Sequence, residues 1–103
     1  MVYQLTRTGT WIGDRGLASQ MQRAAVSIMS NLAEGFERNS PRDFHRFVVI
    51  AKASCGELRS QLYVTLDAGY MSVEQFDDIM QRCIELGRIL GGLKASLRRP
   101  DAV

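Results

Sequence analysis

The carboxylates that could do chemistry in this sequence are Glu34 and Glu57, which stand among apolar or small neighbours. A pair of such groups can act as general acid and general base. His45 is the single histidine, and we predict that it lies on the surface. No nucleophile set and no cluster of Cys, His and Asp at metal-ligand spacing accompanies these residues. The sequence therefore predicts a protein without enzymatic activity, metal, cofactor or small-molecule substrate.

Basic side chains form two groups that could contact the phosphates of RNA or DNA. The first group falls near one helical line and comprises Arg38, Arg42, His45, Lys52 and Arg59. The second group lies toward the end of the chain and comprises Arg88, Lys94, Arg98 and Arg99. The alternative for the first group is a solvated face, because Asp43 lies within it and no aromatic residues interleave to stack bases. The alternative for the second is a favourable interaction with a helix macrodipole.

The charges are arranged in blocks, although the net charge is only +2. Residues 1–66 carry 8 basic and 5 acidic groups, residues 67–86 carry 1 and 5, and residues 87–103 carry 4 and 1. Such blocks could complement one another between subunits or present basic patches to a polyanion. The weak overall excess does not separate these two possibilities.

The chain of 103 residues is expected to form one domain, residues 1–103, in which residues 1–16 are an N-terminal segment and loop. No apolar run has the length needed to span a membrane. Cys55 and Cys83 fall on apolar stripes without metal-ligand spacing, and we expect both to be buried thiols in a reducing compartment. We therefore predict a cytoplasmic protein.

Apolar periodicity predicts three long helices, at about residues 17–37, 41–68 and 73–98. Ser40 and Pro41 suit an N-cap and the first helical position, Gly69 suits a left-handed C-terminal residue, and residues 71–76 contain a capping box with a hydrophobic staple. The expected inward positions are 17, 21, 24 or 25, 28, 29, 32 and 36, then 44, 48, 51, 55, 58, 62 and 65, then 76, 79, 83, 86, 90, 93 and 97.

Short connections between long helices predict an all-α, up-down bundle of the four-helix type. Only residues 1–6 precede the loop, so we expect the first helix to be short or missing. Three amphipathic helices leave a seam to fill. Either the segment from Val2 to Leu5 packs into this seam or another subunit covers it.

Residues 20–36, QMQRAAVSIMSNLAEGF, and residues 51–58, AKASCGEL, followed by Gln61 and Leu62, resemble the proteins encoded in intervening sequences of bacterial 23S ribosomal RNA genes. Residues 86–91 also resemble the related accessory variability proteins of diversity-generating retroelements. The resemblance implies a four-helix bundle that forms a homopentamer, without enzymatic activity. In the retroelement branch it implies binding to nucleic acid and to a reverse transcriptase.

The residues that the resemblance marks as its structural signature include Asn31, Glu34, Gly35 and Glu57. We expect Asn31 to hold helix register through a side-chain hydrogen bond. Glu34 is expected to pair with Arg38, and Glu57 with an arginine or a backbone donor at a helix contact.

These observations predict a homo-oligomer that binds RNA or acts as a scaffold. A protein–protein adaptor with no nucleic-acid role is the alternative, and an enzyme using Glu34 and Glu57 is the third possibility.

Overall fold

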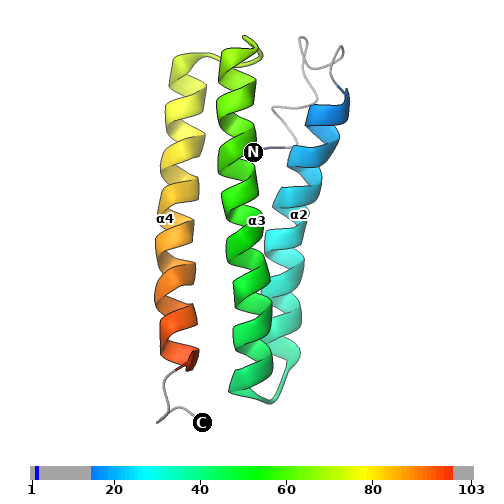
Figure 1. The fold of residues 1–103 in the computed structure, drawn as a ribbon, viewed down its shortest axis with the longest axis vertical. Helices are drawn as coiled ribbons and strands as arrows, with labels where there is room; N and C mark the ends of the chain where they lie inside the picture. Colours follow the sequence, from blue (N-terminus) through cyan, green and yellow to red (C-terminus); the bar gives the residue numbers. More distant parts are fainter. Residues whose placement is uncertain (1, 3–14, 99–103) are drawn as a thin grey trace.

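The computed structural model describes Val2 and residues 15–98, of which residues 15–98 form three antiparallel helices (Figure 1). The helices are α2 (Arg15–Glu37), α3 (Pro41–Asp67) and α4 (Val73–Arg98). The predicted fold class and the three predicted helices are confirmed. Helix α2 begins two residues earlier than expected, so Arg15 and Gly16 belong to a helix and not to the predicted loop. The rest of that loop lies outside the described residues.

Local sequence signals set the boundaries of α3. The hydroxyl oxygen of Ser40 accepts a hydrogen bond from the Asp43 backbone N–H at 3.3 Å, and Pro41 occupies the first turn. At the other end Gly69 has a φ angle of +79°, which L residues with a side chain rarely adopt. The Tyr70 N–H then reaches the Thr65 carbonyl at 3.0 Å, so that α3 ends in a Schellman motif.

Helix α4 starts with the predicted capping box. The Ser72 N–H donates to Oε1 of Gln75 at 2.9 Å, and the Gln75 N–H donates to Oγ of Ser72 at 3.1 Å. Met71 and Phe76, the two residues of the predicted staple, are both buried. The reciprocal bonds satisfy backbone donors that the helix itself leaves free.

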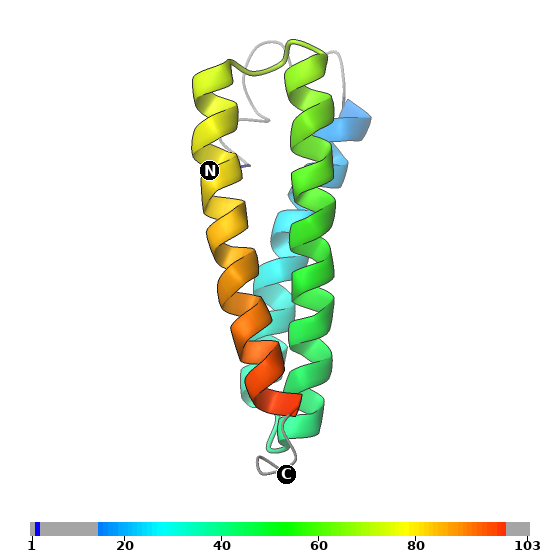
Figure 2. The same ribbon diagram turned by 60° about the vertical axis from the view of Figure 1, so that its left-hand side comes forward.

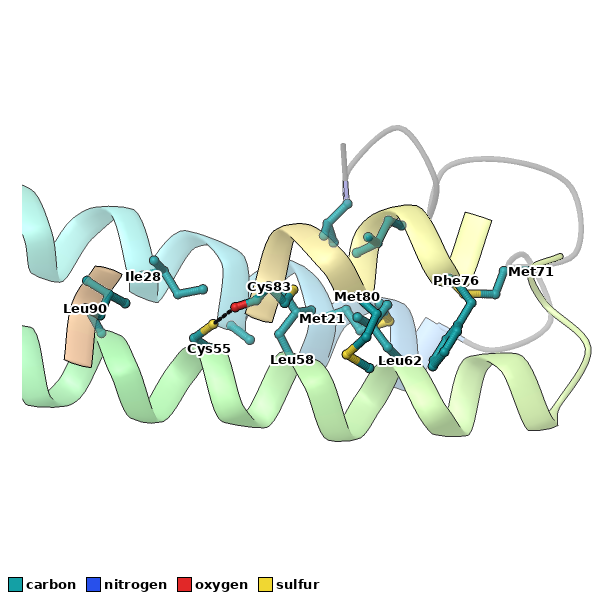
Figure 3. Packing of buried hydrophobic residues seen from close by; sticks show 14 of the residues in the cluster. Met21, Ile28, Cys55, Leu58, Leu62, Met71, Phe76, Met80, Cys83 and Leu90 are labelled. Carbon is teal, nitrogen blue, oxygen red and sulfur yellow. Dashed lines mark hydrogen bonds between the residues drawn. The ribbon is translucent and has the colours of Figure 1, made fainter. Parts of the chain in front are cut away.

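The core lies along α3, because α2 and α4 both pack on this helix and touch each other little (Figure 2). The predicted inward positions of α3 are buried, except that Phe44 is half-buried. Figure 3 shows the apolar side chains of the three helices meeting around Met21, Leu58, Leu62 and Met80. Val2 is buried in the same cluster, whereas the remainder of the segment predicted to fill the seam lies outside the described residues.

The two cysteines are buried as free thiols at the contact between α3 and α4. The Cys55 thiol donates to the Cys83 carbonyl oxygen at 3.2 Å (Figure 3). Burial raises the pKa of the Cys83 thiol to about 11, and the nearby Cys55 makes a smaller contribution in the same direction. Such a thiol stays protonated near neutral pH, as expected for a buried packing group.

Two predicted core positions of α2 are exposed. Met29 is 67% exposed and Phe36 is 71% exposed. On α4, Leu86, Leu93 and Leu97 are only half-buried, whereas Leu90 between them is buried. The prediction of burial was wrong for Met29 and Phe36 because α2 packs mainly on α3 and touches α4 little.

None of the described helices is both long and apolar enough to cross a membrane.

Candidate nucleic-acid interface

Three basic side chains of the first predicted group lie exposed on α3. Lys52 faces α4, since its Cε lies 3.4 Å from the point that a Cβ atom on Gly91 would occupy. Burial raises the pKa of the Cys55 thiol, and the positive charges of Arg59 and Lys52 partly oppose this effect. Arg42 lies on the first turn of the same helix. We call Arg42, Lys52 and Arg59 the α3 cation line.

The α3 cation line is free of ion pairs within the part of the chain that the structure describes. It runs for about 25 Å at the 1.5 Å rise per residue of a helix. Three unpaired cations on one rigid helix can contact the phosphates of a single strand without first breaking internal salt bridges.

Two members of the first predicted group lie apart from this line. Arg38 is in the connection between α2 and α3, where its guanidinium contacts the Glu34 carboxylate at 3.1 Å. The predicted surface position of His45 holds only in part. This side chain is half-buried, and its Nε2 atom is enclosed without a hydrogen-bond partner among the described residues.

The structure describes only part of the second predicted basic group. Arg88 is exposed and pairs with Glu85 of the preceding turn at 3.1 Å. Lys94 is half-buried near the end of α4. Helix α4 ends at Arg98, and Arg99 lies outside the described residues. Cations at this end favour the helix macrodipole whether or not they bind a ligand.

Aromatic rings surround the connection between α2 and α3, where we expected no aromatic residues to interleave with the basic ones. The Phe36 and Phe44 ring centroids are 5.0 Å apart. The guanidiniums of Arg38 and Arg46 lie over the Phe47 ring, at 5.1 and 5.3 Å from its centroid. We call these five residues the turn cluster. Arg46 and the aromatic rings were missed, although Phe44 and Phe47 stand between and beside arginines in the sequence.

Gly35, one of the signature residues, makes the turn cluster possible. A Cβ atom at this position would lie 2.8 Å from Cδ1 of Phe44 and 3.3 Å from Cβ of Phe47. Both distances are shorter than ordinary carbon–carbon contacts. Glycine is therefore needed for the close approach of α2 to the two rings.

Asn31 acts within a short polar network. Its amide donates to the Ser27 carbonyl at 2.8 Å and to the Ser27 hydroxyl at 3.1 Å. The Ser27 hydroxyl in turn bonds to the Ser54 hydroxyl of α3 at 2.7 Å. Among the residues that the structure describes, Asn31 thus reaches the neighbouring helix through Ser27, so its expected effect on helix register is indirect.

Glu34 and Glu57 lie in different surroundings, and both are exposed. The predicted pairing of Glu34 with Arg38 is confirmed, whereas Glu57 has no ion pair within the described residues. Glu57 lines a groove of about 320 Å³ between α2 and α3, together with Gln20, Arg23, Ala24, Ser27, Ser54 and Gln61. Glu34 does not line this groove. No group of three or more His, Cys, Asp and Glu side chains that could hold a metal ion occurs within the described residues.

Comparison with known proteins agrees with the signature residues of α2 and α3. No curated protein matches the chain in a sequence search. The family model of the 23S rRNA-intervening sequence protein matches residues 1–92, a range that contains α2, α3 and most of α4. The chain therefore belongs to the 23S rRNA-intervening sequence protein family.

Proposed function

We propose that this protein is a non-enzymatic, self-assembling helical scaffold that binds RNA through the α3 cation line. The observation that carries the proposal is the set of three exposed and unpaired cations on one helix. Binding is favourable because Lys and Arg side chains that neutralise phosphates release the counterions condensed on the nucleic acid. The proposal places the protein in the cytoplasm, where its two free thiols would stay reduced.

Self-association is proposed from the apolar surface. Met29 and Ile89 are 67% and 57% exposed on the two helices that touch each other little. Contiguous apolar surface is usually covered by a partner in soluble proteins. A ring would cover it through one repeated interface, and the family resemblance favours five subunits.

The RNA-binding proposal is tested with the triple variant Arg42→Ala, Lys52→Ala, Arg59→Ala. Binding to a fluorescein-labelled oligoadenylate is followed by anisotropy over a series of salt concentrations. Loss of three phosphate contacts on a single strand should weaken binding and reduce the slope of log K against log salt by about 2. The matched control is Arg15→Ala, Arg23→Ala, Arg82→Ala, which removes the same charge elsewhere. Equal slopes for the parent and the first triple variant would refute the proposal.

The assembly is tested by sedimentation velocity at micromolar concentration. A species of five times the 11.5 kDa chain mass is expected. A folded monomer would refute self-association. A stable dimer or tetramer would refute the number five but retain the argument from apolar burial.

A protein–protein adaptor without a nucleic-acid role is the second candidate, and an apolar hollow of α3 favours it. Tyr63, Val64, Leu66 and Asp67 line a depression of about 500 Å³. Tyr63 and Val64 are 59% and 54% exposed. An adaptor would retain its partner when the α3 cation line is removed and would bind oligoadenylate no better than the triple variant does.

A further inference from the structure

We propose that the turn cluster is a binding site for an unpaired nucleotide, in which the Phe36 ring stacks on a base and Arg38, Arg42 and Arg46 hold the adjoining phosphates. This inference rests on the proposed RNA binding and assigns its ligand class, which is single-stranded and not duplex RNA. The site lies at the end of the bundle where α2 joins α3 and where α4 ends (Figures 1 and 2).

The Phe36 ring is open to solvent and yet supported from the protein side. Phe36 is 71% exposed. Its ring centroid lies 5.0 Å from that of Phe44, with an interplanar angle of 51°. Phe44 is in turn held against Gly35. A supported aromatic ring with an open face can accept a base by stacking, and such stacks contribute strongly to single-strand binding.

The neighbouring arginines are oriented by the Phe47 ring. Arg38 and Arg46 both lie over this ring, at 5.1 and 5.3 Å from its centroid. Stacking against an aromatic ring engages the face of a guanidinium and leaves its N–H edge for hydrogen bonds. That edge matches the fork geometry of phosphate oxygens. The turn cluster thus combines a ring for a base with two forks for phosphates.

Carboxylates at this turn would compete with phosphates for the arginines. Glu34 contacts Arg38 at 3.1 Å, and Asp43 contacts Arg46 at 4.0 Å. The four side chains of these pairs are 42–65% exposed, so the pairs stabilise the protein little and can be exchanged for phosphate contacts. Glu37 is a third acid at the turn and is exposed.

Arg42 connects the turn cluster to the α3 cation line. It lies on the first turn of α3, one turn before Arg46, and has no ion pair among the residues that the structure describes. Arg42 and the turn cluster lie at the same end of α3, so a strand bound along the α3 cation line can continue to the exposed Phe36 ring. In a duplex the bases are stacked on one another and present no free face to this ring, which is why the site selects an unpaired strand.

The test compares two substitutions at one position. Phe36→Leu keeps an apolar side chain but removes the stacking face, whereas Phe36→Trp keeps it. Each variant is titrated by anisotropy against fluorescein-labelled oligoadenylate and against a labelled duplex of oligoadenylate with oligouridylate. We expect Phe36→Leu to bind the single strand roughly 5- to 100-fold more weakly, Phe36→Trp to bind it at least as tightly as the parent, and duplex binding to be unchanged. Val73→Ala, which alters a side chain that is 59% exposed at the opposite end of the bundle, is the control.

Sedimentation of each variant distinguishes an RNA contact from a subunit contact. The inference is overturned if Phe36→Leu binds the single strand like the parent, if it weakens single-strand and duplex binding equally, or if it changes the mass of the assembly. A second variant, Arg46→Lys, keeps the charge but loses the fork, and an affinity equal to that of the parent would refute the role of Arg46. If the parent itself binds neither RNA, the proposed function fails, which is a separate result from parent-like binding by Phe36→Leu.

Discussion

The two turns of this protein both join antiparallel helices, but they differ in whether the phenylalanine beside the turn is buried. At the α3–α4 turn, Met71 and Phe76 are buried and the capping bonds of Ser72 and Gln75 are complete. At the α2–α3 turn, the Phe36 side chain is in solvent and aromatic rings alternate with arginines. The first turn therefore buries its phenylalanine in the core of the bundle. The second leaves apolar and cationic groups available to a partner.

The largest difference in stability between the turns is expected when Phe76 and Phe36 are each replaced by alanine. Phe76 is 9% exposed and contacts Tyr63, with 5.2 Å between ring centroids. Phe76→Ala should lower the free energy of unfolding by about 3–5 kcal/mol, because it leaves a cavity in the core. Phe36→Ala should lower it by about 1 kcal/mol at most.

Urea unfolding followed by circular dichroism, at one protein concentration for all variants, measures both values. Similar losses for the two variants would mean that Phe36 is buried in the assembled protein and would contradict the contrast between the turns.

A smaller effect is expected at Gly35, which is required for space. Gly35→Ala should destabilise the protein by about 1–3 kcal/mol through the contacts of its Cβ with Phe44 and Phe47. Alanine is otherwise the better helix former by about 1 kcal/mol, so a stabilised variant would show that the rings can move aside. Combining Gly35→Ala with Phe44→Leu should recover part of the loss if the ring contact is its cause, and a double-mutant cycle measures that coupling.

The capping box of α4 should contribute less than either packing contact. Ser72→Ala removes the acceptor of the Gln75 N–H and is expected to lower the free energy of unfolding by about 1 kcal/mol. Ser40→Ala, at the start of α3, is the matched variant at the other turn. Thermal unfolding of the two variants compares the caps directly, and a Ser72→Ala protein with the midpoint of the parent would argue against the capping bond.

The smallest effect is expected at Glu34. The sequence predicted that Glu34 pairs with Arg38, and the structure places this pair at 56% and 44% side-chain exposure. Glu34→Ala should therefore change stability by about 0.5 kcal/mol or less. Chemical denaturation in low and high salt tests this expectation, since a loss of several kcal/mol would require a buried partner in the assembly.

Much of the fold followed from local signals in the sequence. Ser40, Ser72 and Gln75 mark the starts of α3 and α4 through hydrogen bonds between their side chains and nearby backbone groups. Gly69 marks the end of α3 through its positive φ angle. These bonds form within a few residues, so the sequence is sufficient to predict them. The apolar stripe of α3, in which Phe44 is only half-buried, was predicted in the same way, because a helix that contacts partners on two sides must bury a wide apolar face.

Only the tertiary structure determined which apolar and charged side chains remain exposed to solvent. Met29 and Phe36 fit the helical period of α2, but their exposure depends on how α2 is rotated against α3 and on how little it touches α4. The enclosure of His45 Nε2 and the gathering of Arg38 and Arg46 on the Phe47 ring likewise arise from contacts between elements. Periodicity gives the direction of a side chain around its own helix. Only the packing of the helices determines whether another element lies in that direction.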